Sequence, residues 1–360
     1  MRALLLTLAL TCTAHSQFTI QQSNTTASLR GIHNVGNGVA WASGTSGTVL
    51  HTTDGGTTWQ TCPIPPDAEK LDFRGVQAFD ANTAIVMSSG KGDLSRLYKT
   101  TDACKSWKLI FTNPDKEGFW DALVLDKSES AANFLNYGLL IGDPVGGKFP
   151  LWKFEKESGP EIAKRIRART SEAAFAASNS SVFFGFDAWW IATGGKSGAR
   201  VIRSSSHLSD ELGFTTYPSS AVPVGKRTES SGIFSIAFAH PLGHFIDNTK
   251  LNGVVVGGEY TKPNDETDIA AYSANSGKNW NASQTQPHGY RSSVAYDEKS
   301  KSWITVGPNG TDISTDDGKN WCPLTPSKTE APDADKNWNA LSLPYVVGPK
   351  GRIGKLNPLK

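Results

Sequence analysis

Short apolar runs that end at a glycine recur along the whole chain. In the first, residues 39–43 are mostly apolar, Gly44 ends the run, and a second strand-like run with Val49 and Leu50 at its centre follows over residues 48–51. Runs of this kind, rich in β-branched and aromatic residues, are typical of β-strands joined by tight turns. Seven such turns lie 41 to 63 residues apart, near Gly44, Gly90, Gly142, Gly194, Gly257, Gly307 and Gly348. This spacing is typical of four-stranded blades, so we predict an all-β fold, a single seven-bladed β-propeller.

An eight-residue phrase ending in tryptophan follows several of these runs. Residues 52–59 fit the pattern S/T-x-D-x-G-x-T-W, and related phrases occupy residues 100–107, 273–280 and 314–321. The phrase resembles the Asp-box (BNR repeat), a structural turn between the two outer strands of a blade. We expect its Asp or Asn to accept backbone N–H groups and its Trp to pack between blades. These residues are Asp54, Trp59, Asp102, Trp107, Asn275, Trp280, Asp316 and Trp321. Cys104 replaces the glycine of the second phrase, which predicts a distorted turn there.

The last blade is one strand short. Residues 339–343, 345–347 and 352–356 read as three strands, after which the sequence stops. The run Phe18–Gln21 could supply the missing outer strand and so remove an open sheet edge. We therefore expect one propeller over residues 17–360, closed by its N-terminal strand. Residues 161–177 are polar and basic at their start, and we expect a loop insertion there.

The N-terminus has the composition of an export signal. Arg2 precedes an apolar stretch over residues 3–10, and Ala14, His15 and Ser16 form a small-x-small cleavage site. We predict a signal peptide over residues 1–16 and an exported protein, either periplasmic or extracellular. The chain contains no apolar run of 18 residues, so we predict no transmembrane span.

Charge and cysteine content narrow the possible partners. Without Arg2, the chain has 35 Lys and Arg against 34 Asp and Glu, a balance that argues against nucleic-acid binding. The wide spacing of Cys62, Cys104 and Cys322 does not fit a metal site. Cys62 and Cys104 lie at the outer edges of neighbouring predicted blades and could pair, but we favour buried thiols. We expect no metal and no cofactor. The sequence leaves the oligomeric state open, and we expect a monomer.

Charged residues recur where the inner strands are expected to begin. Aligning residues 28–31, 72–75 and 289–292 places Arg30, Arg74 and Arg291 at equivalent positions of blades one, two and six. Blade seven lies between blades six and one, so we expect the three arginines on one wall of the channel mouth. The opposite wall and adjoining turns are expected to contribute Asp121, Asp143, Glu259, Tyr260, Lys262 and Tyr290.

Two interpretations of this mouth stay open. The planar fork of arginine suits carboxylate or phosphate, so the three arginines favour an anionic ligand or an acidic peptide segment. Alternatively, the charges pair with one another and hold the mouth together.

An enzyme is the second functional hypothesis. Three arginines in an Asp-box propeller resemble the carboxylate-binding triad of sialidases, but the chain has no Arg-Ile-Pro motif, and Tyr260 directly follows Glu259. Adjacent strand residues point to opposite faces, which weakens a Tyr–Glu pair. Asp121 and Asp143 could still form the carboxylate pair of a glycoside hydrolase, with Glu259 nearby.

Longer segments resemble one propeller family. Residues 29–56, 70–74, 142–145, 260–263 and 289–292 look like the photosystem II stability/assembly factor type, in an exported bacterial branch. The resemblance covers residues 18–356, although blades three and four lack the eight-residue phrase. It implies a propeller that binds a membrane-protein subunit through a patch of arginines, which Arg30, Arg74 and Arg291 could form here.

We therefore expect a non-enzymatic assembly or scaffold propeller that docks an acidic or carboxylate-bearing protein at an arginine-lined channel mouth. The alternative is a glycan-acting propeller, a hydrolase or a lectin, that uses Asp121, Asp143 and Glu259.

Overall fold

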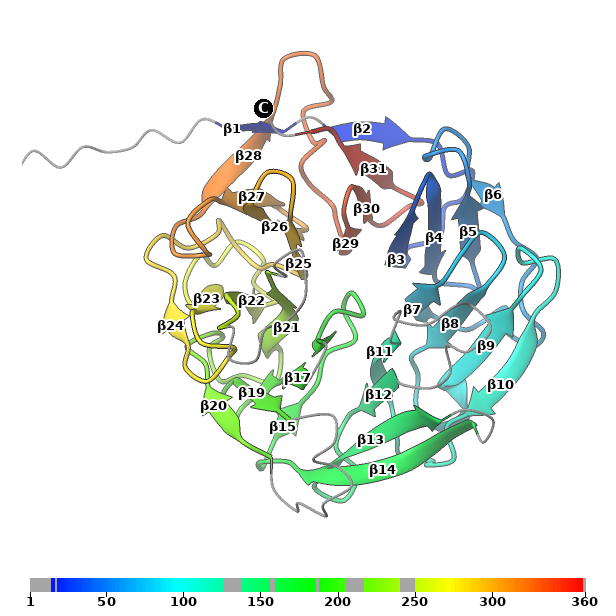
Figure 1. The fold of residues 1–360 in the computed structure, drawn as a ribbon, viewed down its shortest axis with the longest axis horizontal. Coiled ribbons are helices and arrows are strands. Elements are labelled where there is room, and N and C mark those ends of the chain that lie inside the picture. Colours follow the sequence, from blue (N-terminus) through cyan, green and yellow to red (C-terminus); the bar gives the residue numbers. More distant parts are fainter. Residues whose placement is uncertain are drawn as a thin grey trace, which may run out of the picture.

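Seven β-sheets stand around a central axis (Figure 1). The computed structural model describes residues 14–16, 18–125, 138–155, 159–185, 188–204, 217–239 and 250–358. The predicted seven-bladed, all-β propeller is confirmed.

Blades 1 to 3 are four-stranded antiparallel sheets that follow one another along the chain. From the axis outwards, blade 1 is β3 (Leu29–Gly36), β4 (Val39–Gly44), β5 (Val49–Thr52) and β6 (Gln60–Thr61). Blade 2 is β7 (Phe73–Ala78), β8 (Ala84–Ser88), β9 (Arg96–Thr100) and β10 (Lys108–Thr112), with the 3-10 turn η1 (Gly92–Leu94) between β8 and β9. Blade 3 is β11 (Trp120–Leu125), β12 (Gly138–Gly142), β13 (Lys148–Glu155) and β14 (Gly159–Arg167). Because β14 is a strand, the loop insertion expected from residue 161 is wrong for its first part.

Blade 4 is again four-stranded, whereas blades 5 and 6 include additional strands from other parts of the chain. Blade 4 is β16 (Val182–Phe184), β17 (Trp189–Ala192), β19 (Arg200–Arg203) and β20 (Ser219–Ala221). Blade 5 is β21 (Ser231–Phe238), β22 (Gly253–Glu259), β23 (Ala270–Ser273) and β24 (Asn281–Ala282), extended by β18 (Gly194–Gly195) and β15 (Glu172–Ala173). Blade 6 is β25 (Ser293–Asp297), β26 (Ser302–Gly307), β27 (Gly310–Ser314) and β28 (Cys322–Pro326), with β1 (Ala14–Ser16) parallel to β28.

Blade 7 joins the two ends of the chain. Its C-terminal strands are β29 (Ala340–Ser342), β30 (Tyr345–Val347) and β31 (Ile353–Leu356). The outer strand is β2 (Phe18–Gln21), which runs antiparallel to β31 with Phe18 opposite Leu356. Phe18 also packs on Trp338, with ring centroids 5.7 Å apart. The predicted closure is confirmed, and the outer edge of β31 is paired rather than open.

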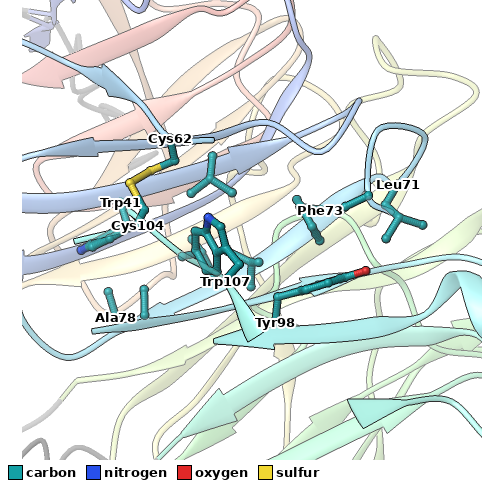
Figure 2. Packing of buried hydrophobic residues seen from close by; sticks show 13 residues of the cluster. Trp41, Cys62, Leu71, Phe73, Ala78, Tyr98, Cys104 and Trp107 are labelled. Atoms are coloured by element: carbon teal, nitrogen blue, oxygen red, sulfur yellow. A yellow bond between two sulfur atoms is a disulfide. The ribbon is translucent and has the colours of Figure 1, made fainter. Parts of the chain in front are cut away.

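Apolar side chains fill the wedges between blades. Each tryptophan of the eight-residue phrases is buried in an apolar cluster between two neighbouring blades. Trp59 lies between blades 7 and 1, Trp107 between blades 1 and 2, Trp280 between blades 4 and 5, and Trp321 between blades 5 and 6. Figure 2 shows Trp107 in its cluster with Trp41 of blade 1 and Tyr98 of blade 2. A large buried ring on each interface holds neighbouring blades together.

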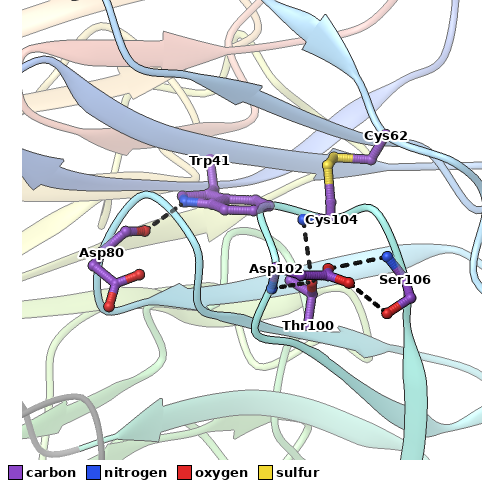
Figure 3. The surroundings of a disulfide bond; sticks show 7 residues. All are labelled: Trp41, Cys62, Asp80, Thr100, Asp102, Cys104 and Ser106. Atoms are coloured by element: carbon purple, nitrogen blue, oxygen red, sulfur yellow. Dashed lines mark hydrogen bonds between the residues drawn. A yellow bond between two sulfur atoms is a disulfide. The ribbon is translucent and has the colours of Figure 1, made fainter.

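The phrase with Cys104 forms the same turn as the first phrase. In the first, Thr58 N donates to Asp54 Oδ1 at 2.9 Å; in the second, Ser106 N donates to Asp102 Oδ1 at 3.0 Å (Figure 3). Cys104 takes the left-handed conformation that glycine favours, with φ +59°. The distortion predicted from this substitution is therefore wrong, because cysteine adopts the strained conformation instead of changing the turn.

A disulfide joins Cys62 of blade 1 to Cys104 of blade 2 (Figures 2 and 3). Cys322 is not a free thiol either. The buried thiols that we favoured are thus wrong, and the alternative pairing of Cys62 with Cys104 is confirmed. The pair lies beside Trp41, whose Nε1 donates to the carbonyl of Asp80 at 3.0 Å across the same blade interface.

Most of the predicted signal peptide, residues 1–13, lies outside the described residues. Within the part of the chain that the structure describes, no helix is long and apolar enough to cross a membrane.

Candidate functional site

The two ends of the propeller carry different turns. At one end, the turn after each second strand meets the residue before the inner strand: Thr45 N donates to Ser28 O, Ser89 N to Asp72 O, and Asp143 N to Phe119 O, at 2.9 to 3.1 Å. We call this end the entry face, because the inner strands begin there. The eight-residue phrases lie at the other end, where Gly55 N donates to Gly38 O at 2.9 Å. Arg30, Arg74, Asp121, Asp143 and Glu259 all belong to the entry face.

A β-bulge at the start of the inner strand presents three of the predicted residues. The register shifts between Leu29 and Gly31 in blade 1, between Phe73 and Gly75 in blade 2, and between Trp120 and Ala122 in blade 3. The residues inside these shifts are Arg30, Arg74 and Asp121. A bulged residue has no strand partner and its side chain is re-aimed, so the same local device places all three.

Arg30 and Arg74 share a single carboxylate. Arg74 Nε donates to Asp72 Oδ2 at 2.8 Å, and Arg30 Nε lies 3.8 Å from the same oxygen. Burial, and then the charge of Arg74, lowers the pKa of Arg30. Arg74 also donates to the carbonyl of Ala176 at 3.2 Å and lies 5.9 Å above the ring of Phe119. This pair of guanidiniums is partly exposed and has more positive charge than Asp72 balances.

Asp121 and Asp143 form an interacting carboxyl pair beside Arg74. Burial, and then the charge of Asp143, raises the pKa of Asp121 well above its ordinary value, while Arg74 acts against this. Burial raises the pKa of Asp143 to about 6, opposed by a hydrogen bond from Ala174 N at 3.1 Å. We had expected this pair on the wall opposite the arginines. Its interaction with Arg74 places it next to them instead. A raised pKa favours the neutral form of Asp121, which weakens its ability to balance the charge of Arg74.

Arg291 is not part of this cluster, which corrects our prediction. Its side chain is fully buried; Nε donates to Asp312 Oδ2 at 2.7 Å and a second nitrogen to Asn309 Oδ1 at 2.6 Å. His288 Nδ1 lies 2.6 Å from the other oxygen of Asp312. Arg291 thus belongs to a network inside blade 6.

A one-residue error in the alignment explains the misplacement. Arg291 N donates to the Gly257 carbonyl of the preceding blade, just as Leu29 N donates to Gly348 O and Trp338 N to Gly307 O. Arg291 therefore occupies the core position of Leu29, and Ser292 is the residue equivalent to Arg30. A one-residue slip moves a strand side chain to the other face.

Glu259 is bound by residues of blade 5, from its own turn and from the loop before β21. Its Oε1 accepts hydrogen bonds from Ser230 Oγ at 2.5 Å and Thr261 Oγ1 at 2.7 Å, and these lower its pKa. Lys262 Nζ lies 3.9 Å from the other oxygen. Glu259 has no described contact with Asp121 or Asp143, so the three carboxylates do not form one group.

Aromatic residues flank the arginines, a feature that the sequence interpretation recognised only in Tyr260 and Tyr290. Tyr290 packs edge-on against Phe234, with ring centroids 4.9 Å apart and planes at 90°. Phe234 also contacts two further rings: Tyr260 packs edge-on against it with centroids 6.1 Å apart, and Phe175 stacks on it with centroids 4.1 Å apart. Phe234 occupies the bulge between Ile233 and Ser235, the position equivalent to Arg30. Alignment of the inner strands could therefore have identified it.

The structure also contains a cleft of about 880 Å³, lined largely by polar residues, that the sequence did not predict. It lies where the loop before β3 meets the β30–β31 turn, and Gly351 N donates to Ala27 O there at 2.7 Å. The residues around it include Gln22, Asn24, Asp333, Lys350 and Arg352. No three His, Cys, Asp or Glu side chains converge as a metal site in the described residues.

Structure comparison relates the chain to two solved propellers. No protein-family model matches the chain, and no curated protein matches it significantly. A structure described as YCF48 bound to D1 peptide covers 96% of this chain and 100% of its own, at 15% identity and a TM-score of 0.59. YCF48 from Cyanidioschyzon merolae covers 95% and 99%, at 17% identity and a TM-score of 0.59. The chain thus shares the fold of these YCF48 propellers along almost its whole length, in agreement with the fold that the sequence resemblance implied.

Proposed function

We propose that this chain is a non-enzymatic assembly or scaffold propeller that docks a carboxylate-bearing protein segment at the centre of its entry face. The observation that carries the proposal is the pairing of two arginines, Arg30 and Arg74, with one carboxylate, Asp72. Asp72 balances only one of the two positive charges, and the pair is partly desolvated. A ligand carboxylate would supply the missing partner and accept charge-assisted hydrogen bonds.

Unfilled hydrogen-bonding capacity supports an incoming ligand. Arg30 Nε and Asp72 Oδ1 are buried and have no hydrogen-bond partner among the described residues. The cost of leaving such groups unpaired favours a ligand that rearranges or completes the network. Arg30 remains the more accessible of the two cations, with 31% of its side chain exposed.

Exposed apolar side chains on the same face favour a protein partner. Tyr260 is 52% exposed, Leu94 48% and Ile64 47%. All three lie in entry-face turns: Leu94 between β8 and β9, Tyr260 after β22, and Ile64 against the turn that contains Gly47. Aromatic residues and arginine are enriched in protein interfaces, and apolar side chains form their cores. A protein partner is also supported by the YCF48 structure, in which a protein of the same fold is bound to a D1 peptide.

We also propose that the protein is exported. The N-terminal pattern Arg2, apolar core and small-x-small site supports an export signal. The Cys62–Cys104 disulfide supports it independently, because disulfides persist mainly in oxidising compartments.

A charge-reversal comparison tests the docking site. The probes are two decapeptides that differ only in having Asp or Asn at three positions, and binding is measured by calorimetry. The wild type should prefer the Asp peptide, and Arg30→Glu/Arg74→Glu should weaken its binding at least tenfold. Lys108→Glu/Arg165→Glu changes net charge equally on exposed outer strands, and should bind like the wild type. Equal loss in both variants would show that overall charge, and not this site, attracts the peptide.

The Asp121–Asp143 pair favours glycan hydrolysis as a second candidate. A carboxyl group with a raised pKa, as both members of this pair have, is what a general acid requires. The burial of Asp121, 1% exposed, limits substrate access. Asp121→Asn should abolish turnover of a glycan without loss of binding if this candidate is right; absence of turnover in the wild type across a panel of glycans would reject it.

A further inference from the structure

The centre of the entry face has two chemically different halves. The arginine half contains Arg30 and Arg74 from blades 1 and 2. The aromatic half contains Phe234 and Tyr260 from blade 5 and Tyr290 from the loop before β25, with Phe175 stacked beneath Phe234. A site of this composition can recognise two neighbouring groups of one ligand.

Tyr290 connects the two halves. It interacts electrostatically with both Arg30 and Tyr260, and it packs edge-on against Phe234 with ring centroids 4.9 Å apart. The side chain is 7% exposed, so its position is fixed by packing. The arginine half reaches the same rings, because Arg74 donates to the Ala176 carbonyl at 3.2 Å and the adjacent Phe175 stacks on Phe234 at 4.1 Å.

The aromatic half is rigid at its base and open at its rim. Phe234 is 3% exposed and lies between Phe175 at 4.1 Å and Tyr290 at 4.9 Å. Tyr260 is 52% exposed and is held on one side by Phe234. Its free face offers an apolar surface that a ligand side chain can cover at small entropic cost, because the supporting rings are already ordered.

Building on the proposed function, we infer that Phe234, Tyr260 and Tyr290 form an apolar subsite, and that the preferred partner segment has an aromatic or branched aliphatic residue directly beside its carboxylate. The carboxylate pairs with Arg30 and Arg74, while the neighbouring side chain covers Tyr260. Charge selects acidic segments, and the subsite selects among them.

Peptide pairs test this inference. The first pair ends in Asp-Phe-Gly-amide or Asp-Ala-Gly-amide, so that the carboxylate comes from an internal side chain. The second pair ends in Phe or Ala with a free C-terminal carboxylate, and amidated copies of it lack that charge. Binding to the full chain is measured by calorimetry for the wild type, Tyr260→Ala and Leu109→Ala. Leu109 is a matched control, because it is 45% exposed on the outer strand β10.

In the wild type, the Phe peptide of at least one pair should bind about tenfold more tightly than its Ala partner. In Tyr260→Ala this preference should fall below threefold, while Leu109→Ala keeps it. The pair that shows the preference identifies the source of the carboxylate, and amidation should abolish it only for the C-terminal pair. Phe234→Leu should reduce the preference in the same way, with a thermal unfolding curve to verify folding.

The inference is overturned if the wild type binds Phe and Ala peptides equally, or if Tyr260→Ala keeps the preference. If in either case acidic peptides still bind the wild type and Arg30→Glu/Arg74→Glu still weakens their binding, the proposed function stands. If no acidic peptide binds the wild type, the proposed function fails and this inference fails with it.

Discussion

Arg291 and Asp312 form a buried ion pair inside blade 6. Arg291 Nε donates to Asp312 Oδ2 at 2.7 Å, and neither side chain is more than 1% exposed. The carboxylate and a further bond to Asn309 hold the guanidinium away from the entry face. This arginine therefore contributes to the structure of the blade, in contrast to Arg30 and Arg74, whose guanidiniums are partly exposed.

Arg291→Met should destabilise the fold strongly. Removal of one partner leaves Asp312 charged and buried, which costs about 3–5 kcal/mol in the free energy of unfolding. Arg30→Met, at a partly exposed pair, should cost less than about 1 kcal/mol. Urea denaturation of both variants checks the difference. Arg291→Met/Asp312→Leu should recover much of the loss, and equal costs for Arg291→Met and Arg30→Met would contradict the assignment.

Loss of the disulfide should lower stability without changing the fold. The link closes a loop with a sequence separation of 42 residues, and the chain-entropy estimate for such a loop is about 4 kcal/mol. Cys62→Ala/Cys104→Ala should therefore unfold at lower urea concentration, with an unchanged far-ultraviolet circular dichroism spectrum. A loss of β-structure in this variant would mean that the disulfide also determines the arrangement of blades 1 and 2.

Glycine at position 104 should be better than alanine once the disulfide is absent. Cys104 has φ +59°, a conformation that costs a non-glycine residue about 1 kcal/mol. Cys62→Ala/Cys104→Gly should thus be more stable than Cys62→Ala/Cys104→Ala by about 1 kcal/mol in urea denaturation. The opposite order would show that the side chain at position 104 contributes more by packing than it costs in strain.

Asp143 should make stability fall as the pH rises from about 4 to 6. Its pKa is about 6 in the folded chain and ordinarily 3.8, so the folded state binds more protons in this window. The free energy of unfolding therefore decreases with pH across the window and changes little from this group above it. Asp143→Asn should show a shallower dependence in urea denaturation at pH 4, 5, 6 and 7. An identical slope in wild type and variant would reject the raised pKa.

Binding of acidic peptides should strengthen between pH 7.5 and 5.5. Protonation of Asp143 removes a negative charge from the carboxyl pair beside Arg74, while Asp side chains of the peptide remain mostly ionised. Calorimetry at both values should give a lower Kd at pH 5.5 for the wild type. In Asp143→Asn this change should largely disappear; if it persists unchanged, other groups cause it.

The amino-acid sequence determined the architecture. Strand-forming runs, glycine turns and the eight-residue phrase are local patterns, and their repetition sufficed to predict seven blades and the closure of β31 by Phe18–Gln21. Arg30 and Arg74 were also predictable as neighbours, because both precede a glycine at the same place in adjacent blades.

Tertiary structure decided the site. A shift of one residue buried Arg291 against Asp312, and the folding of separate blades brought Asp121 to Asp143, Cys62 to Cys104 and Phe234 to Tyr290. Local sequence patterns report which segments form strands, because backbone hydrogen bonding and apolar periodicity act over a few residues. Which side chains meet depends on bulges and strand register, where one residue reverses the face, and on contacts between distant segments.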